Sequence, residues 1–377
     1  MAATIKYGDT KWAVKDGNTL GYNDENRFKP VPFDFTRNSI GTRVDRNGLI
    51  ETIGNNIPRI DFTDNTDGHL LLEPQSTNLI TYSEDFSEWS LSNATVEGGY
   101  LAPDGSNNAY KVSGTVGSSS IYLGGVNATD TRTIWARTVS GTGQAQLCSY
   151  FGNTNNLKKL TNEWQRFEVV DTTTATGAAN FYAIDFRGST DLSEIIIWGA
   201  QSEALSHSTS YIPTNGSTVT RASETCTNAG NSTLINSTEG VLYAEIAALA
   251  NDGTNRRISI SDGSDTNRLN LFYTSTTNEI KANYRVSNST VVTIDTTDFD
   301  ITSFNKIAFR WQSGNFVLFI NGQDKGTNSN TTMISANTLN VLRFEDPNLV
   351  NEFYGKCKAL TVYNTALTDA ELTELTS

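Results

Sequence analysis

The sequence predicts an all-β protein built from antiparallel β-sandwiches, with one short helix at the C-terminal end. Strand-length blocks rich in Val, Ile, Thr and aromatic residues recur along the chain, and such residues fit a pleated, half-buried surface. Clusters of Gly, Asn, Asp and Ser separate these blocks, as turns do. At about 150 residues per domain, a chain of 377 residues should hold two or three domains.

Charge and cysteine content exclude several classes of function. The formal net charge is -13 and no run of Lys or Arg occurs, which disfavours nucleic-acid binding because that needs cationic groups. Cys148, Cys226 and Cys357 form no C-x-x-C pair, so neither a disulfide framework nor a zinc site is predicted. A bridge between Cys226 and Cys357 stays open as an alternative. With only His69 and His207 in the chain, a histidine-based metal site is not expected.

The N-terminal residues contain no apolar core of a signal peptide, and no window of about 18 apolar residues occurs. We therefore expect no membrane insertion. The chain is expected to be made and kept in a cytoplasm, or to leave it inside a larger assembly.

Residues 1–76 are interpreted as an N-terminal attachment and connector segment rich in β-hairpins. Within this segment, Asn47-Gly48 is a strong signal for a type I′ hairpin turn. Residues 42–46 and 49–53 would be the two arms.

Arginines are crowded in the same segment for so acidic a chain. Guanidinium groups bind carboxylates in bidentate geometry, so Arg37, Arg43 and Arg46 are predicted to bind acidic groups of a partner protein, with Arg59 nearby. The alternative is internal pairing with acids close in sequence, namely Asp34, Asp45, Glu51 and Asp61.

Two further regions carry the pattern of sandwiches. Residues 77–222 contain strand-length blocks separated by turns such as 103–107, without a helical period between them. In residues 223–377, Phe316–Ile320 is apolar on both faces and predicts a fully buried central strand. Thr368 and Glu371 have the spacing of a capping box, which predicts the short helix at the end.

Catalytic signatures are missing from the sequence. Glycoside hydrolysis needs two carboxylates about 5 to 9.5 Å apart across a cleft. The strand 243–247 offers only Glu245, and Asp298 and Asp300 alternate in a stretch interpreted as a loop. No G-x-S-x-G elbow, phosphate loop or dinucleotide fingerprint occurs. We predict that the protein is not an enzyme.

Three resemblances add to this reading. The blocks Asn78-Leu79-Ile80, Trp164-Gln165-Arg166 and 194–201 resemble jelly-roll carbohydrate-binding modules. Residues 316–322 and 363–372 resemble the concanavalin A-like, laminin-G type lectin fold. The layout of 33–80 with 209–222 resembles bacteriophage tail and fibre proteins.

The jelly-roll resemblance implies a sugar site in residues 77–222. Sugar binding needs an aromatic platform and short polar groups, and the candidates are Trp135, Tyr150, Phe151, Tyr182 and Arg187. For each aromatic residue, core packing is the alternative. The resemblance assigns three other tryptophans to packing, namely Trp89, Trp164 and Trp198.

The lectin resemblance makes calcium a second candidate ligand, because related folds often bind it. The loops 251–255 and 262–267 offer carboxylates from Asp252, Asp262 and Asp265, and calcium prefers oxygen ligands. Ordinary turn chemistry explains the same residues.

Together the resemblances imply a phage virion protein of the tail or head fibre type, assembled in the host bacterial cytoplasm. Its N-terminal region would attach to other virion proteins, and its sandwiches would face host cell-surface polysaccharide. Resemblance to fibres implies a homo-oligomer, with a trimer favoured, in which repeated weak sites raise avidity. The alternatives are a purely structural virion decoration or connector protein, and a non-catalytic bacterial carbohydrate-binding protein.

Overall fold

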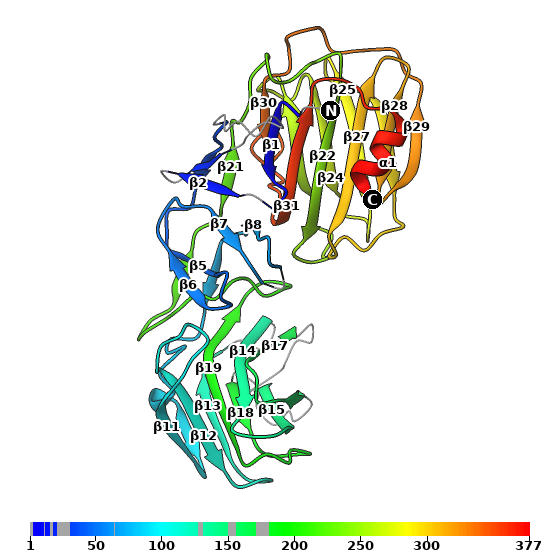
Figure 1. The fold of residues 1–377 in the computed structure, drawn as a ribbon. Helices are drawn as coiled ribbons and strands as arrows, with labels where there is room; N and C mark the ends of the chain where they lie inside the picture. Colours follow the sequence, from blue (N-terminus) through cyan, green and yellow to red (C-terminus); the bar gives the residue numbers. More distant parts are fainter. Residues whose placement is uncertain are drawn as a thin grey trace. The chain divides into compact units, whose positions relative to one another are not determined.

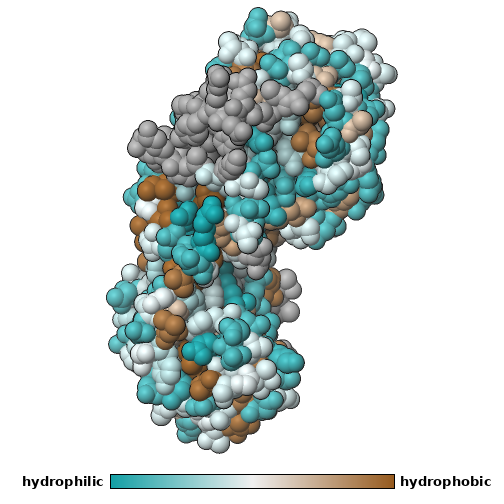
Figure 2. Space-filling view, in the orientation of Figure 1, coloured by the Kyte–Doolittle hydropathy of each residue, from teal (hydrophilic) through white to brown (hydrophobic). Residues whose placement is uncertain are grey.

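The computed structural model describes residues 3–10, 12–15, 18–20, 31–63, 65–126, 131–149, 156–170 and 181–377. These residues confirm the predicted fold class, because antiparallel sheets dominate and a single short α-helix ends the chain. In the described part, neither this helix nor the one 3₁₀ turn is long and apolar enough to cross a membrane. In the view of Figure 2, hydrophilic residues and residues of intermediate hydropathy cover most of the described surface, with hydrophobic residues scattered between them.

The chain forms two compact units that alternate along the sequence. Unit 1 consists of Met1–Asn38, Gly54–Pro74 and Ser223–Ser377, and unit 2 of Ser39–Ile53 and Gln75–Ala222. The segment 1–76, expected to act as one connector, is therefore divided between the two units.

Unit 1 is a sandwich of two antiparallel sheets (Figure 1). The larger sheet has the order β29 (Gln323–Asn328), β28 (Phe316–Ile320), β27 (Asn305–Gln312), β22 (Glu239–Ala248), β31 (Gly355–Tyr363), β8 (His69–Leu72) and β7 (Arg59–Asp61), with β1 (Ile5–Gly8) also paired to β31. The smaller sheet has the order β26 (Ser289–Thr296), β25 (Ile280–Val286), β24 (Arg268–Tyr273), β23 (Arg256–Ser261) and β30 (Val341–Arg343). Two short pairs, β2 (Ala13–Lys15) with β3 (Asn18–Leu20) and β4 (Asp34–Thr36) with β21 (Thr225–Thr227), complete the unit.

Alternation along the strands builds the core of unit 1. In β25, Ile280, Ala282 and Tyr284 point inward, because successive side chains of a strand face opposite sides. Strand β28 is buried along its whole length, which confirms the predicted central strand. Burial of apolar surface at about 25 cal/mol per Å² is the main favourable term.

The predicted C-terminal helix is confirmed as α1 (Asp369–Thr376). Thr368 accepts from the backbone N–H of Glu371, whose carboxylate accepts from the N–H of Thr368, so the capping box is complete. Leu372 packs with Val317 and Phe319 on the outward face of the larger sheet, where Figure 1 shows α1 against β27 and β28.

Unit 2 is a second two-sheet sandwich. One sheet has the order β10 (Ser90–Ser92), β13 (Ser120–Gly124), β18 (Phe181–Asp185), β15 (Gly143–Ser149) and β16 (Leu157–Leu160). The other has the order β11 (Ala94–Tyr100), β12 (Ala109–Gly114), β19 (Glu194–Glu203), β14 (Thr131–Thr138) and β17 (Gln165–Val170). The remaining elements are β5 (Gly41–Val44), β6 (Ile50–Ile53), β9 (Ser76–Asn78), the 3₁₀ turn η1 (Phe86–Glu88) and β20 (Val219–Arg221).

The predicted hairpin at Asn47-Gly48 forms, but with a larger loop than a type I′ turn. Val44 pairs with Ile50, and the Asp45 carboxylate accepts from the N–H groups of Asn47 and Leu49. Gly48 adopts φ +80°, which a glycine tolerates without strain. The two-residue turn was therefore wrong because Asp45 organises a wider loop.

Candidate functional site

Of the predicted sugar-binding residues of unit 2, the structure describes Trp135, Tyr182 and Arg187, and these three have different surroundings. Tyr182 is buried in the core, where its hydroxyl donates to the carbonyl of Thr133 at 2.7 Å. Its role as a rim residue is therefore corrected. Tyr150 and Phe151 lie outside the described residues. Arg187 is part-exposed and binds Asp185 through two nitrogens.

Trp135 belongs to a second apolar cluster, on the outward face of the sheet β11–β12–β19–β14–β17. Its ring lies 5.4 Å from that of Trp198 and 5.6 Å from that of Tyr211, with the Arg166 guanidinium 4.5 Å from its centre. Ile50 of the β5–β6 hairpin packs in this cluster. The sheet therefore buries most of Trp135 by packing within the unit.

Trp164, assigned to packing from the resemblance, is only half-buried at the edge of that same cluster. The Arg137 guanidinium lies 5.3 Å from the centre of its ring. The resemblance assigned Trp164 and Trp89 alike to core packing, but of these two residues Trp89 is the one buried in the core of unit 2.

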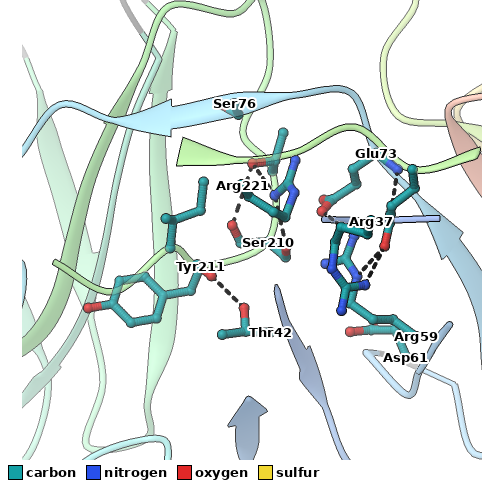
Figure 3. Close-up of polar contacts among 12 residues, drawn as sticks. Arg37, Thr42, Arg59, Asp61, Glu73, Ser76, Ser210, Tyr211 and Arg221 are labelled. Atoms are coloured by element: carbon teal, nitrogen blue, oxygen red, sulfur yellow. Dashed lines mark hydrogen bonds and ion pairs between the residues drawn. The ribbon is translucent and has the colours of Figure 1, made fainter. Parts of the chain in front are cut away.

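The arginines of the N-terminal region divide into two kinds. Arg37 is fully buried in unit 1, donates to Glu224 at 2.7 Å and to the carbonyls of Gly54 and Ile57, and lies near Arg59 (Figure 3). Arg59 in turn bonds both Glu224 and Glu73. The prediction that Arg37 binds a partner protein is wrong, because its donors are spent on buried groups of its own unit.

Arg43 pairs with Glu51 at 2.7 Å across the β5–β6 hairpin, as the alternative of internal pairing expects. Arg46 is exposed at the tip of that hairpin. Partner binding by Arg43 and Arg46 stays a prediction. Nearby in unit 2, Arg221 donates to Thr209 and Ser210, and Thr42 donates to the carbonyl of Tyr211 (Figure 3).

The three aspartates proposed for calcium do not form a shared site. Asp252 precedes β23 and Asp262 follows it, so the six residues of that strand hold them roughly 20 Å apart. Burial alone would raise the pKa of Asp252, but the Arg256 charge and the bonds from Thr254 and Arg256 outweigh it and lower the pKa to about 2. Among the described residues, no group of three or more His, Cys, Asp or Glu side chains is placed to hold a metal ion.

Asp265 has a different environment from the one that calcium would need. It pairs with Arg268 and, at 3.0 Å, with Arg285. Two guanidinium groups beside one carboxylate repel a further cation. The turn explanation holds for Asp262, whose carboxylate accepts from Ser264 and Asn267.

Asp265 lies beside a surface that we define as the polar face, namely the outward surface of the sheet β26–β25–β24–β23–β30 in unit 1. The cross-strand register arranges its side chains in three rows, because directly opposed residues share a face. The rows are Arg257, Phe272, Lys281 and Asp295; Arg343, Ser259, Asn270, Asn283 and Thr293; and Val341, Ser261, Arg268 and Arg285.

One half of the polar face is covered by the loop that follows β30. Asp346 of this loop accepts from Arg257 at 2.8 Å and from Arg268 at 2.6 Å, and Ser259 donates to the carbonyl of Glu345. Burial raises the pKa of Glu345, although Arg343 acts against that rise. These contacts hold the arginines of β23 and β24 in fixed positions.

The other half, over β25 and β26, is open to solvent. Thr293 and Asp295 are exposed, and Lys281, Asn283 and Arg285 are part-exposed. Three of the arginines, Arg257, Arg285 and Arg343, keep a buried Nε donor without a hydrogen-bond acceptor, and the Oδ1 of Asn283 likewise lacks a donor. Such buried unpaired groups are uncommon in proteins, and an ordered water molecule or an ion often satisfies them.

The covering loop also presents an apolar tip. Leu349 is 64% exposed and Val350 is 50% exposed. The backbone φ is +60° at Leu349 and +57° at Asn351, a region that non-glycine residues seldom adopt. Backbone strain of this kind tends to occur at binding sites.

The polar face lies within a segment that matches a known protein-family model. Residues 231–373 match the family model of the concanavalin A-like lectin/glucanases superfamily, and the strands β22–β31 of the sandwich lie inside this segment. Unit 1 therefore contains a concanavalin A-like lectin-type sandwich. No curated protein matches the chain.

Several solved structures resemble part of the chain. The carbohydrate-binding module CBM40 of the Ruminococcus gnavus IT-sialidase, bound to α2,3-sialyllactose, is 16% identical, covers 40% of this chain and 94% of its own, and has a TM-score of 0.34. Domain 4 of the Geobacillus stearothermophilus arabinanase AbnA, in complex with arabinotriose, is 14% identical, covers 41% of this chain and 73% of its own, and has a TM-score of 0.34. At these scores the similarities say nothing about the ligand of this chain.

Proposed function

We propose that the protein is a non-catalytic glycan-binding protein, and that the open half of the polar face holds the glycan. The observation that carries this proposal is the row of amide, hydroxyl and cationic groups that β25 and β26 present on a lectin-type sandwich. Asn283, Thr293 and Lys281 supply both donors and acceptors, as sugar hydroxyls require. The apolar tip at Leu349 and Val350 offers contact area for the apolar face of a sugar ring.

The acids of the polar face support binding rather than hydrolysis. Asp265, Glu345 and Asp346 each face an arginine, and ion pairing removes the free carboxylate pair that glycoside hydrolysis needs. Asp298 pairs with Lys325, and Asp300 caps Thr302. We expect no release of reducing sugar from any polysaccharide that the protein binds.

The biological setting that we propose is a phage virion. The resemblance of 33–80 and 209–222 to tail and fibre proteins supports it, and Arg43 and Arg46 are the groups proposed to contact other virion proteins. Each chain would bind weakly, so a homo-oligomer would strengthen attachment through avidity. If mass spectrometry does not find this chain in purified particles, the virion setting is contradicted, and the proposal of glycan binding is unaffected.

Glycan binding is tested with an array of bacterial surface polysaccharides and the full chain. Lys281→Ala, Asn283→Ala and Thr293→Ala together should abolish binding without a change in melting temperature. The matched control is Lys159→Ala with Gln165→Ala, two exposed positions on strands of unit 2, which should bind like the unaltered chain. Absence of binding by all three proteins, or equal binding by all three, would contradict the proposal.

A further inference from the structure

The arginines of the polar face point to the charge of the ligand. The chain carries 28 Lys and Arg residues against 41 Asp and Glu residues, yet four arginines and one lysine share this one surface. Their acidic partners are Asp346, Asp265, Glu345 and Glu279. With Asp295, which lies opposite Lys281, the acids of this surface equal its five cations in number, so the polar face concentrates charges of both signs.

Two kinds of ion pair occur on this surface. Asp346 is 5% exposed and bridges Arg257 and Arg268, so a ligand cannot reach between them without displacing the covering loop. The pair of Arg285 and Asp265 is different, because the side chains are 22% and 24% exposed. A part-exposed ion pair contributes less to stability than a buried one. Asp265 also pairs with Arg268, so it can keep that pair when another anion takes its place on Arg285.

Arg285 has the chemistry to accept that exchange. A guanidinium group presents five N–H donors in a planar fork that matches a carboxylate or sulfate group. Asp265 engages one terminal nitrogen of Arg285, while the Nε has no acceptor. Its neighbour across the sheet, Arg268, is held in place by Asp346 and Asp265.

The spacing along β25 indicates the length of the ligand. Lys281, Asn283 and Arg285 are every second residue of the strand and therefore lie on the same face. At about 3.3 Å per residue, Lys281 and Arg285 lie about 13 Å apart, with Asn283 between them. A single sugar cannot contact both cations, whereas a chain of several sugars can.

We infer that the ligand is an acidic oligosaccharide or polysaccharide, and that Arg285 binds its carboxylate or sulfate group in place of Asp265. This inference rests on the proposed function and names the substrate class of the same surface. In the free protein, the Asp265 carboxylate occupies the position that the anionic group of the glycan takes in the complex.

The test measures binding of the full chain to a uronic-acid polysaccharide, to the same polymer after reduction of its carboxyl groups, and to a sulfated polymer before and after desulfation. Arg285→Gln should weaken binding to the acidic form about tenfold, because it removes a charge-assisted hydrogen bond. It should leave binding to the neutral form unchanged. Loss of affinity on reduction identifies a carboxylate ligand, and loss on desulfation identifies a sulfate ligand.

A second variant gives the opposite sign. Asp265→Asn frees Arg285 and should raise affinity for the acidic polymer a few-fold, which a merely structural arginine pair would not produce. Lys111→Gln is the matched control for Arg285→Gln, since it removes one cation from an exposed pair with Glu97 in unit 2 and lowers the net charge by the same amount. Glu97→Gln is the matched control for Asp265→Asn, since it removes the anion of that pair. Melting temperatures should agree for all variants.

The outcomes separate the two proposals. Equal binding to acidic and neutral polymers, with no effect of Arg285→Gln, overturns the inference about charge and leaves glycan binding standing. Equal weakening by Lys111→Gln and Arg285→Gln also overturns it, because the effect would then be one of net charge. If no polymer binds at all, the proposed function is contradicted, and so is this inference, because it rests on that function.

Discussion

Two five-stranded sheets, one in each unit, differ in what covers their outward faces. In unit 2, the sheet β11–β12–β19–β14–β17 carries Trp135, Trp198 and Ile196 outward, and the chain packs Ile50 and Tyr211 against them. In unit 1, the sheet β26–β25–β24–β23–β30 carries arginine, asparagine and serine outward, and the loop after β30 covers half of it.

This contrast shows how each unit uses its second face. An apolar outward face is stable only when something covers it, and unit 2 covers its own with the β5–β6 hairpin. A polar outward face can stay in contact with water, and the open half in unit 1 keeps side chains available for a ligand. The first face should therefore matter for stability and the second for binding.

Removing the apolar face of unit 2 should have the largest effect. Trp198→Ala deletes a fully buried ring that contacts Trp135 and Tyr211, and such truncations cost about 3 to 5 kcal/mol. Urea unfolding followed by tryptophan fluorescence reports this loss, because four of the six tryptophans belong to unit 2. Glycan binding measured below the transition should be unchanged, and a loss of binding would contradict the contrast.

The buried arginines of unit 1 and the part-exposed Arg43 of unit 2 should also differ in how much their ion pairs contribute to stability. Glu224→Gln leaves Arg37 and Arg59 buried with one carboxylate fewer, and breaking a buried pair costs about 3 to 5 kcal/mol. Glu51→Gln removes the partner of the part-exposed Arg43 and should cost less than about 1 kcal/mol. Denaturant midpoints by circular dichroism compare the two variants, and equal midpoints would refute the distinction.

Acid should weaken unit 1 through His69. Burial lowers the pKa of His69 to about 4, although Asp61 acts to raise it. Below about pH 6.5 the unfolded chain takes up a proton that the folded chain refuses, so stability should fall between pH 6.5 and pH 4, by about 3 kcal/mol. His69→Gln should remove this part of the pH dependence, and identical pH profiles for both proteins would contradict it.

The smallest effect on stability is expected at the hairpin tip. Arg43→Ala with Arg46→Ala should change the free energy of unfolding by about 1 kcal/mol or less, since one residue is part-exposed and the other exposed. If this hairpin contacts other virion proteins, incorporation of the chain into particles should fall. Unchanged incorporation would limit both arginines to local pairing.

Local signals in the sequence predicted elements well. The apolar run Phe316–Ile320 and the capping box of Thr368 with Glu371 depend on neighbours a few residues away, and both are confirmed. The polar face also left a signal, since Arg, Ser and Asn alternate with apolar residues in β23, β24 and β25. Alternation within a strand shows that its polar side chains face outward. It does not show that strand pairing brings four arginines onto the same face.

Long-range pairing could not be predicted in the same way. Glu224 lies 187 residues from Arg37, so nothing near Arg37 indicates that its charge is neutralised inside unit 1. Leu70, Leu71 and Leu72 pair with Cys357, Lys356 and Gly355, which assigns part of the expected connector to the sandwich of unit 1. Tyr182 looked like a surface aromatic because its hydroxyl bond to Thr133 exists only in the fold.

The most direct test of the polar face as the binding surface is a crystal structure of the full chain with an acidic oligosaccharide. We predict electron density for the sugar along β25, with its anionic group on Arg285 and a hydroxyl on Asn283. Asp265 should have turned away from Arg285. Density for the sugar only on unit 2, with Arg285 still paired to Asp265, would contradict the account.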